Sequence, residues 1–84
     1  MQYPFTFYAI IDLLSLSEFN QLKNGMTYDE CVEIIGTEGK QQMEIEVLDI
    51  STINYVWSGE SFGATATLTF QDNKLVSKSQ FNLK

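Results

Sequence analysis

The sequence contains no histidine and a single cysteine, Cys31. Without histidine, acid–base catalysis and metal ligation by imidazole are excluded. With one cysteine, neither an internal disulfide nor a paired-cysteine metal motif can form. The sequence also lacks a glycine-rich phosphate-binding loop. We therefore expect a protein that is not an enzyme and that holds no cofactor and no metal.

Basic residues are scarce, because five Lys stand against eleven Asp and Glu and leave a formal net charge of −6 at pH 7. Such a charge repels phosphate backbones and anionic lipid surfaces, so nucleic acid is not an expected partner. It favours a cation-rich partner, although the same charge also keeps a small domain soluble. Hydrophobic residues make up 44% of the chain, which predicts a packed core rather than a disordered chain.

Only the N-terminal extension, residues 1–14, is strongly apolar over a continuous stretch. It lacks a preceding Lys or Arg, contains Pro4 and Asp12, and is shorter than the roughly 20 residues that span a bilayer. It therefore predicts neither a signal peptide nor membrane insertion, and a cytoplasmic location is expected. The alternative is the bacterial cell envelope, if a signal segment has been removed. Apolar surface of this kind packs on its own domain or forms a homodimer, with the candidate contacts Tyr3, Phe5, Phe7 and Tyr8.

Residues 15–84 are predicted to form one domain that begins with two short helices. Each helix starts with a capping box, in which a Ser or Thr precedes a Glu by three residues. The two boxes are Ser15 with Glu18 and Thr27 with Glu30. Apolar residues at helical spacing follow each box, and Gly25 and Gly36 are suited to the left-handed conformation that ends a helix. The pattern predicts a helix over 16–24 and a second one ending at Gly36, joined as a tight hairpin.

After Gly39 the hydrophobic period changes to two, which is typical of strands. Four strands are predicted, around 43–47, 53–58, 62–70 and 75–81, and the first two are expected to be half-buried. Their connections are too short for parallel crossovers, so the sheet is expected to be antiparallel. The predicted fold class is α+β, with the N-terminal two-helix hairpin packed on a four-stranded antiparallel sheet.

The third strand separates an apolar row from a polar row. The apolar row, expected to face the helices, is Phe62, Ala64, Ala66, Leu68 and Phe70. The opposite face is expected to present Thr65, Thr67 and Thr69, with Asn54 and Ser58 from the second strand and Lys78 or Gln80 from the fourth. We interpret this polar face as a candidate partner-binding surface; the alternative is an ordinary solvated sheet face.

Three further features leave alternatives open. Tyr55 and Trp57 share one face of the second strand. They belong to the core if this is the face that carries the apolar row of the third strand, and they form a binding patch if it points outward. Glu44 and Glu46 share a strand face and indicate a solvated strand edge whose charges oppose aggregation; the alternative is a pair of functional carboxylates. Cys31 lies within an apolar helical stripe, which indicates a buried structural thiol; the alternative is a thiol made reactive by a helix N-terminus.

The run from Phe19 to Gly36 resembles the opening of the β-lactamase-inhibitor-protein-like repeat. Tyr55-Val56-Trp57, Thr67 to Phe70 and Lys74 to Phe81 resemble its later strands, so the resemblance covers residues 15–84. It is similar to small uncharacterised bacterial lipoprotein domains and, more distantly, to outer-membrane assembly lipoproteins of the same plan. The resemblance implies a two-helix layer on a four-stranded sheet and a function in protein binding, often through the exposed sheet face.

The leading hypothesis is a non-enzymatic protein-binding module, an inhibitor or adaptor that docks through its exposed sheet face and the adjoining loop 59–63. The alternative is a small-ligand binding or sequestering protein that acts as a homo-oligomer. Since β-lactamase inhibitors of this kind carry two such repeats and this sequence shows one, inhibition of a β-lactamase is not expected.

Overall fold

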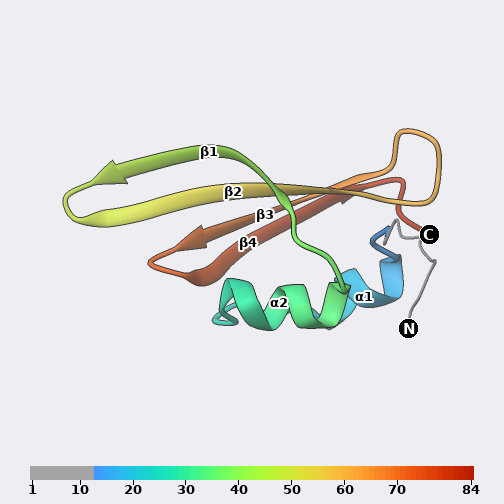
Figure 1. The fold of residues 1–84 in the computed structure, drawn as a ribbon, viewed down its shortest axis with the longest axis horizontal. Helices are drawn as coiled ribbons and strands as arrows, with labels where there is room; N and C mark the ends of the chain where they lie inside the picture. Colours follow the sequence, from blue (N-terminus) through green and yellow to red (C-terminus); the bar gives the residue numbers. More distant parts are fainter. Residues whose placement is uncertain (1–12) are drawn as a thin grey trace, which may run out of the picture.

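The computed structural model describes residues 13–84, which form two helices and a four-stranded antiparallel sheet (Figure 1). The helices are α1 (Leu16–Gln21) and α2 (Tyr28–Ile35), and the strands are β1 (Lys40–Val47), β2 (Ile50–Ser58), β3 (Thr65–Gln71) and β4 (Lys74–Phe81). The strand order is β1-β2-β3-β4, with each strand paired to the next. The predicted α+β fold, with the helices preceding the sheet, is confirmed.

Both predicted capping boxes are present. Ser15 accepts a hydrogen bond from the backbone N–H of Glu18 at 3.1 Å, and the Glu18 carboxylate accepts one from the backbone N–H of Ser15 at 3.0 Å. Thr27 and Glu30 repeat this exchange at 3.2 and 2.9 Å. The sequence therefore fixes both helix starts, because these side chains satisfy backbone donors that have no partner inside the helix.

The helix ends differ from each other. α2 ends at Gly36, which has a φ of 98°, as predicted. α1 ends at Gln21 and not at Asn24, because Leu22 takes an extended conformation and buries its side chain. The linker that follows is held to β4 by two backbone hydrogen bonds, from Gly25 N–H to Leu75 O at 2.8 Å and from Leu75 N–H to Met26 O at 2.7 Å. These bonds end the first helix earlier than its apolar spacing suggests.

Two hairpins of the sheet close with two-residue turns, Leu48-Asp49 and Asp72-Asn73, in which all four residues have positive φ. Such turns match the twist of antiparallel strands. Asp72 also links the second turn to β2, because its carboxylate accepts a hydrogen bond from Ser51 N–H at 3.2 Å and its own N–H donates to Ser51 O at 2.9 Å. The turn predicted around residues 71–74 is confirmed.

The core lies between the helices and one face of the sheet. Its buried residues are Leu14, Phe19, Leu22, Cys31, Ile35, Trp57, Ala64, Ala66, Leu68, Phe70, Leu75 and Leu83. The predicted apolar row is buried from Ala64 to Phe70. Leu14, at the end of the predicted extension, is also fully buried and forms a parallel bridge with Gly59. The N-terminal helices and the C-terminal Leu83 thus share one core.

The helices cover only part of the sheet. Figure 1 shows that the β1–β2 hairpin projects past the end of α2 and past the β3–β4 turn. An eight-residue helix is about 12 Å long, whereas an eight-residue strand reaches about 26 Å. All eight residues of β1 are exposed, so the prediction of a half-buried first strand is wrong.

Candidate protein-binding face

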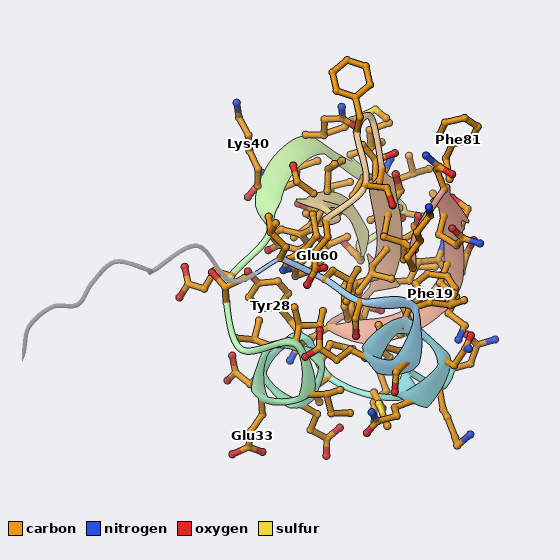
Figure 2. All side chains as sticks on the ribbon, turned by 90° about the vertical axis from the view of Figure 1, so that its right-hand side faces the viewer. Phe19, Tyr28, Glu33, Lys40, Glu60 and Phe81 are labelled. Carbon is orange, nitrogen blue, oxygen red and sulfur yellow. The ribbon has the colours of Figure 1, made fainter. Side chains whose placement is uncertain are left out.

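The register of the sheet defines its open face, the face opposite the helices. Directly paired residues of antiparallel strands point to the same side, and Asn54, Val56 and Ser58 pair with Thr69, Thr67 and Thr65. The open face comprises Lys40, Met43, Ile45 and Val47 from β1, Ile50, Thr52, Asn54, Val56 and Ser58 from β2, Thr65, Thr67, Thr69 and Gln71 from β3, and Lys74, Ser77, Ser79 and Phe81 from β4. Figure 2 shows Lys40 and Phe81 pointing away from the helices.

Five of the predicted partner-binding residues lie together on this face. Ser58 and Thr65 are exposed, whereas Asn54, Thr67 and Thr69 are half-buried among their neighbours. They form a polar, β-branched centre that no described helix covers. Chemically this centre offers hydroxyl and amide groups for hydrogen bonds on a rigid sheet, and it has no carboxylate at any strand position.

Lys78 and Gln80 do not belong to the open face, contrary to the prediction. They pair with Leu68 and Ala66 and so share the helix side of β4. Thr69 pairs with Ser77 but Phe70 pairs with Leu75, so β4 contains one extra residue at this point. The extra residue exchanges the two faces of β4 beyond it, and strict alternation along the sequence does not predict such a shift. Lys78 instead donates a hydrogen bond to Phe19 O at 2.9 Å, and its ammonium lies 4.5 Å from the centre of the Phe19 ring.

Tyr55 and Trp57 lie on the helix side, so the structure places them according to the core interpretation. Trp57 is 3% exposed, and Tyr55 is half-buried and packs against the core. The Tyr55 ring stacks on Tyr28 with 4.2 Å between centroids and meets Phe70 edge-on at 5.8 Å. These aromatic residues hold α2 against the sheet and are not available to a partner on the open face.

Phe62 was predicted to close the buried row, and this prediction is wrong because its side chain is fully exposed. β3 begins only at Thr65. Before it, the loop 59–64 closes through backbone hydrogen bonds from Gly59 N–H to Ala64 O at 2.9 Å and from Ala64 N–H to Ser61 O at 3.0 Å. This turn carries Phe62 outward at its tip, and Gly63 takes a φ of 74°.

An apolar patch at the far end of the open face was missed. Met43, Ile45, Val47, Leu48 and Ile50 are 47%, 48%, 59%, 90% and 45% exposed. The alternation of Met43, Ile45 and Val47 with Glu44 and Glu46 predicts a half-buried strand, but alternation alone does not say whether anything covers the apolar side. Apolar residues at this density with no described cover are typical of an interaction surface.

Cys31 is fully buried, and desolvation raises the pKa of its thiol to about 11. A thiol with a raised pKa is a poor nucleophile at neutral pH, so the structure supports a packing role. Within residues 13–84 no group of three or more acidic, His or Cys side chains could hold a metal ion.

The raised pKa predicts a loss of stability in alkali. The unfolded thiol releases its proton near its ordinary pKa of 9.0, while the folded thiol keeps it up to about 11. Stability should therefore fall as pH rises through this window, by about 2 kcal/mol, and burial of Tyr28, whose pKa is also raised, adds to the loss. Urea unfolding at about pH 8 and about pH 10.5 measures this effect. A Cys31→Ala variant that loses just as much stability over that range would contradict the assignment to the thiol.

The oligomer contacts predicted at Tyr3, Phe5, Phe7 and Tyr8 lie outside the described residues. The homodimer therefore stays a prediction, which the molar mass in solution tests. The part of the chain that the structure describes contains no pocket, so residues 13–84 of a single copy do not by themselves form a small-ligand site. None of the helices in residues 13–84 has the length and hydropathy needed to cross a membrane.

Comparison with known proteins identifies relatives of this fold. Residues 15–84 match the family described as Beta-lactamase inhibitor (BLIP). A solved structure from Streptococcus mutans, assigned as a β-lactamase inhibitor protein, is similar with a TM-score of 0.68 and 28% sequence identity over 87% of this chain. The match covers 47% of the Streptococcus mutans chain, so the present chain spans about half its length. None of the curated proteins matches, and the likeness to outer-membrane assembly lipoproteins is not confirmed.

Proposed function

Because the chain belongs to the β-lactamase inhibitor (BLIP) family, whose members bind proteins as inhibitors, we propose that it is a non-enzymatic inhibitor or adaptor that docks on its partner through the open face. The observation that carries this proposal is the strip formed by Asn54, Ser58, Thr65, Thr67 and Thr69, which nothing within residues 13–84 covers. Three cross-strand pairs, Asn54 with Thr69, Val56 with Thr67 and Ser58 with Thr65, place it on one side of the sheet.

The composition of the open face supports a protein partner. Protein interfaces combine polar groups that hydrogen-bond with a few large apolar anchors. Here the hydroxyl-rich centre is continuous with Phe81, which is 67% exposed and lies directly opposite Thr65. The fully exposed Phe62 lies in the adjoining loop, and the Asn82 side chain donates a hydrogen bond to its carbonyl oxygen at 3.3 Å. This bond ties the loop to the end of β4.

The position of the charges refines the expectation of a cation-rich partner. The strand positions of the open face include Lys40 and Lys74 and no acid. The acidic residues of β1, Glu44 and Glu46, pair with Ile53 and Ser51 and so belong to the helix side. We therefore propose that docking at the centre of the open face depends on hydrogen bonds and apolar contacts rather than on net charge.

The test is a pull-down from native host lysate with the wild-type chain and a Thr65→Lys, Thr67→Lys double variant. Two ammonium groups buried at the centre of an interface carry a desolvation penalty, so the variant should lose the partner recovered by the wild type. The matched control is Ser17→Lys, Asn20→Lys, which adds the same charge on exposed positions of α1. Light scattering and circular dichroism confirm that mass and fold persist in each variant.

If the Thr variant recovers the same partner as strongly as the α1 control, docking on the open face is wrong. If neither wild type nor control enriches a protein, binding of a protein in that lysate is contradicted. The alternative of ligand sequestration then predicts a rise in melting temperature with a metabolite pool.

A further inference from the structure

β1 is an edge strand with an exposed outer side. Among the described strands it pairs with β2 alone, and all eight of its residues are exposed. Within residues 13–84 no other strand lies along its outer side. An edge strand presents alternate backbone N–H and C=O groups that have no partner, and these groups can pair with another strand. Proline is absent from β1, so none of its backbone donors is missing.

The two faces of β1 differ in chemistry. Met43, Ile45 and Val47 lie on the open face, where Val47 pairs with the apolar Ile50. Glu44 and Glu46 lie on the opposite face. A strand added to β1 must therefore match an apolar row on one face and two carboxylates on the other, since directly opposed residues share a face.

A second copy of this chain does not satisfy that condition in the registers centred on residues 44 to 46. Antiparallel pairing of two β1 strands about Ile45 sets Glu44 of each copy against Glu46 of the other. Pairing about Glu44 or about Glu46 sets that residue against its own counterpart. Like charges directly opposite each other destabilise a pair of strands, so the carboxylates disfavour self-pairing in these central registers while they favour a cationic neighbour.

We infer that β1 accepts an extended segment of a partner protein in which apolar and basic residues alternate. This inference rests on the proposed function, because it names the chemistry of a protein partner. The apolar side chains of the segment cover Met43, Ile45 and Val47, and its Lys or Arg side chains face Glu44 and Glu46. Backbone hydrogen bonds along the edge supply the rest of the binding, as in other complexes formed by strand addition.

The test uses synthetic peptides of about seven residues. The first alternates Val and Lys, and the second replaces every Lys by Glu. Binding to the full chain is measured by fluorescence anisotropy, and the site is located from amide chemical shifts. The Val/Lys peptide should bind at least about tenfold more tightly than the Val/Glu peptide, and its shift changes should centre on residues 40–50.

Backbone methylation separates strand addition from side-chain contact alone. All Val residues of an extended peptide direct their N–H and C=O groups to one edge, and all Lys residues direct theirs to the other. N-methylation of the Val set blocks one edge, and N-methylation of the Lys set blocks the other. Strand addition requires that one methylated peptide binds and the other does not. Equal binding by both overturns the inference.

Variants of the protein test the charge match. Glu44→Lys with Glu46→Lys should reverse the preference, so that the Val/Glu peptide binds more tightly. The control is Glu33→Lys with Glu60→Lys, which makes the same change in net charge at two exposed positions outside β1 (Figure 2). This control should keep the preference for Val/Lys. If both double variants weaken the Val/Lys peptide equally, the binding reflects net charge alone and the inference is wrong.

The outcome is independent of docking at the centre of the open face. The Thr65→Lys, Thr67→Lys variant should retain peptide binding within about threefold, since neither residue lies on β1. Failure of the peptides to bind at millimolar concentration would overturn the strand-addition inference and leave the open-face test unaffected. A stable dimer that the Val/Lys peptide does not dissociate, with β1 at its interface, would also overturn it in favour of a second copy.

Discussion

Replacement of Trp57 by Ala is expected to lower the free energy of unfolding by about 3–5 kcal/mol, a large part of the about 5–15 kcal/mol that stabilises a small domain. Trp57 is 3% exposed, and its side chain lies beside two aromatic rings and bonds to a backbone carbonyl. It lies 6.2 Å from both Tyr28 and Tyr55 between ring centroids. Its indole N–H donates a hydrogen bond of 2.9 Å to Thr37 O. Truncation therefore leaves a cavity and an unpaired carbonyl.

The path of the chain around Trp57 explains why the site cannot collapse easily. The backbone of Gly39 passes so close to the ring that a Cβ there would lie 2.7 Å from Trp57 carbon atoms. The same segment is fixed by the hydrogen bond from Gly39 N–H to the Tyr28 hydroxyl at 3.2 Å. Since α2, the loop after it and β2 all meet at this ring, its loss loosens the contact between the helix layer and the sheet.

Urea unfolding followed by circular dichroism measures this effect, because the variant lacks the only tryptophan of the chain. Trp57→Phe is the matched control, which keeps an aromatic ring and removes the hydrogen bond to Thr37. It should cost about 1–3 kcal/mol, less than the Ala variant. A loss of under about 1 kcal/mol for Trp57→Ala would mean that this ring does not hold the two layers together.

The local structure that the sequence predicts best is the structure that single side chains determine. Ser15 and Thr27 start helices by bonding to backbone donors three residues on, and this chemistry depends on nothing distant. Gly36 ends α2 for an equally local reason, since its positive φ suits a residue without a side chain. The Asp72-Asn73 turn belongs to the same class. With short connections, these features are enough to predict the α+β architecture and the antiparallel sheet.

The features that the sequence does not predict depend on distant contacts. Leu22 leaves the first helix because the linker bonds to β4. Lys78 changes face because a register shift intervenes in β4. Met43, Ile45 and Val47 stay exposed because they lie on the face opposite the helices, which no described layer covers. The alternation of apolar and polar residues along a strand is the same whether or not a layer covers its apolar side. Phe62 shows the same limit, since only the hydrogen bonds of loop 59–64 turn it outward.

The candidate site was predictable in its centre and not at its ends. The five polar positions from Asn54 to Thr69 follow from alternation along two paired strands, and the register places them together. The apolar ends of the open face, at Ile45 and at Phe81, are read from the sequence as core positions by default. An exposed apolar residue has no sequence pattern of its own, so the exposed apolar side chains at the two ends of the face are the ones that required the structure.

Phe62→Ala is expected to weaken binding of the partner recovered in the pull-down by at least about thirtyfold, which corresponds to about 2 kcal/mol. The side chain is fully exposed in the free chain, so burial in an interface would realise nearly its whole hydrophobic transfer energy. Its backbone is also held in place, since the Asn82 side chain bonds to its carbonyl oxygen. An aromatic anchor that is presented on an ordered loop loses little conformational entropy on binding.

Substitution of Phe62 should change the affinity for the partner without changing the stability of the fold, and this difference provides the control. An exposed side chain contributes little to the fold, so Phe62→Ala should change the free energy of unfolding by less than about 0.5 kcal/mol. Phe62→Tyr keeps the aromatic ring and should bind almost as tightly as the wild type. Calorimetric titration of the purified partner with the three proteins measures the affinities. Equal affinity for the Ala and Tyr variants would exclude Phe62 as an anchor and confine docking to the strands of the open face.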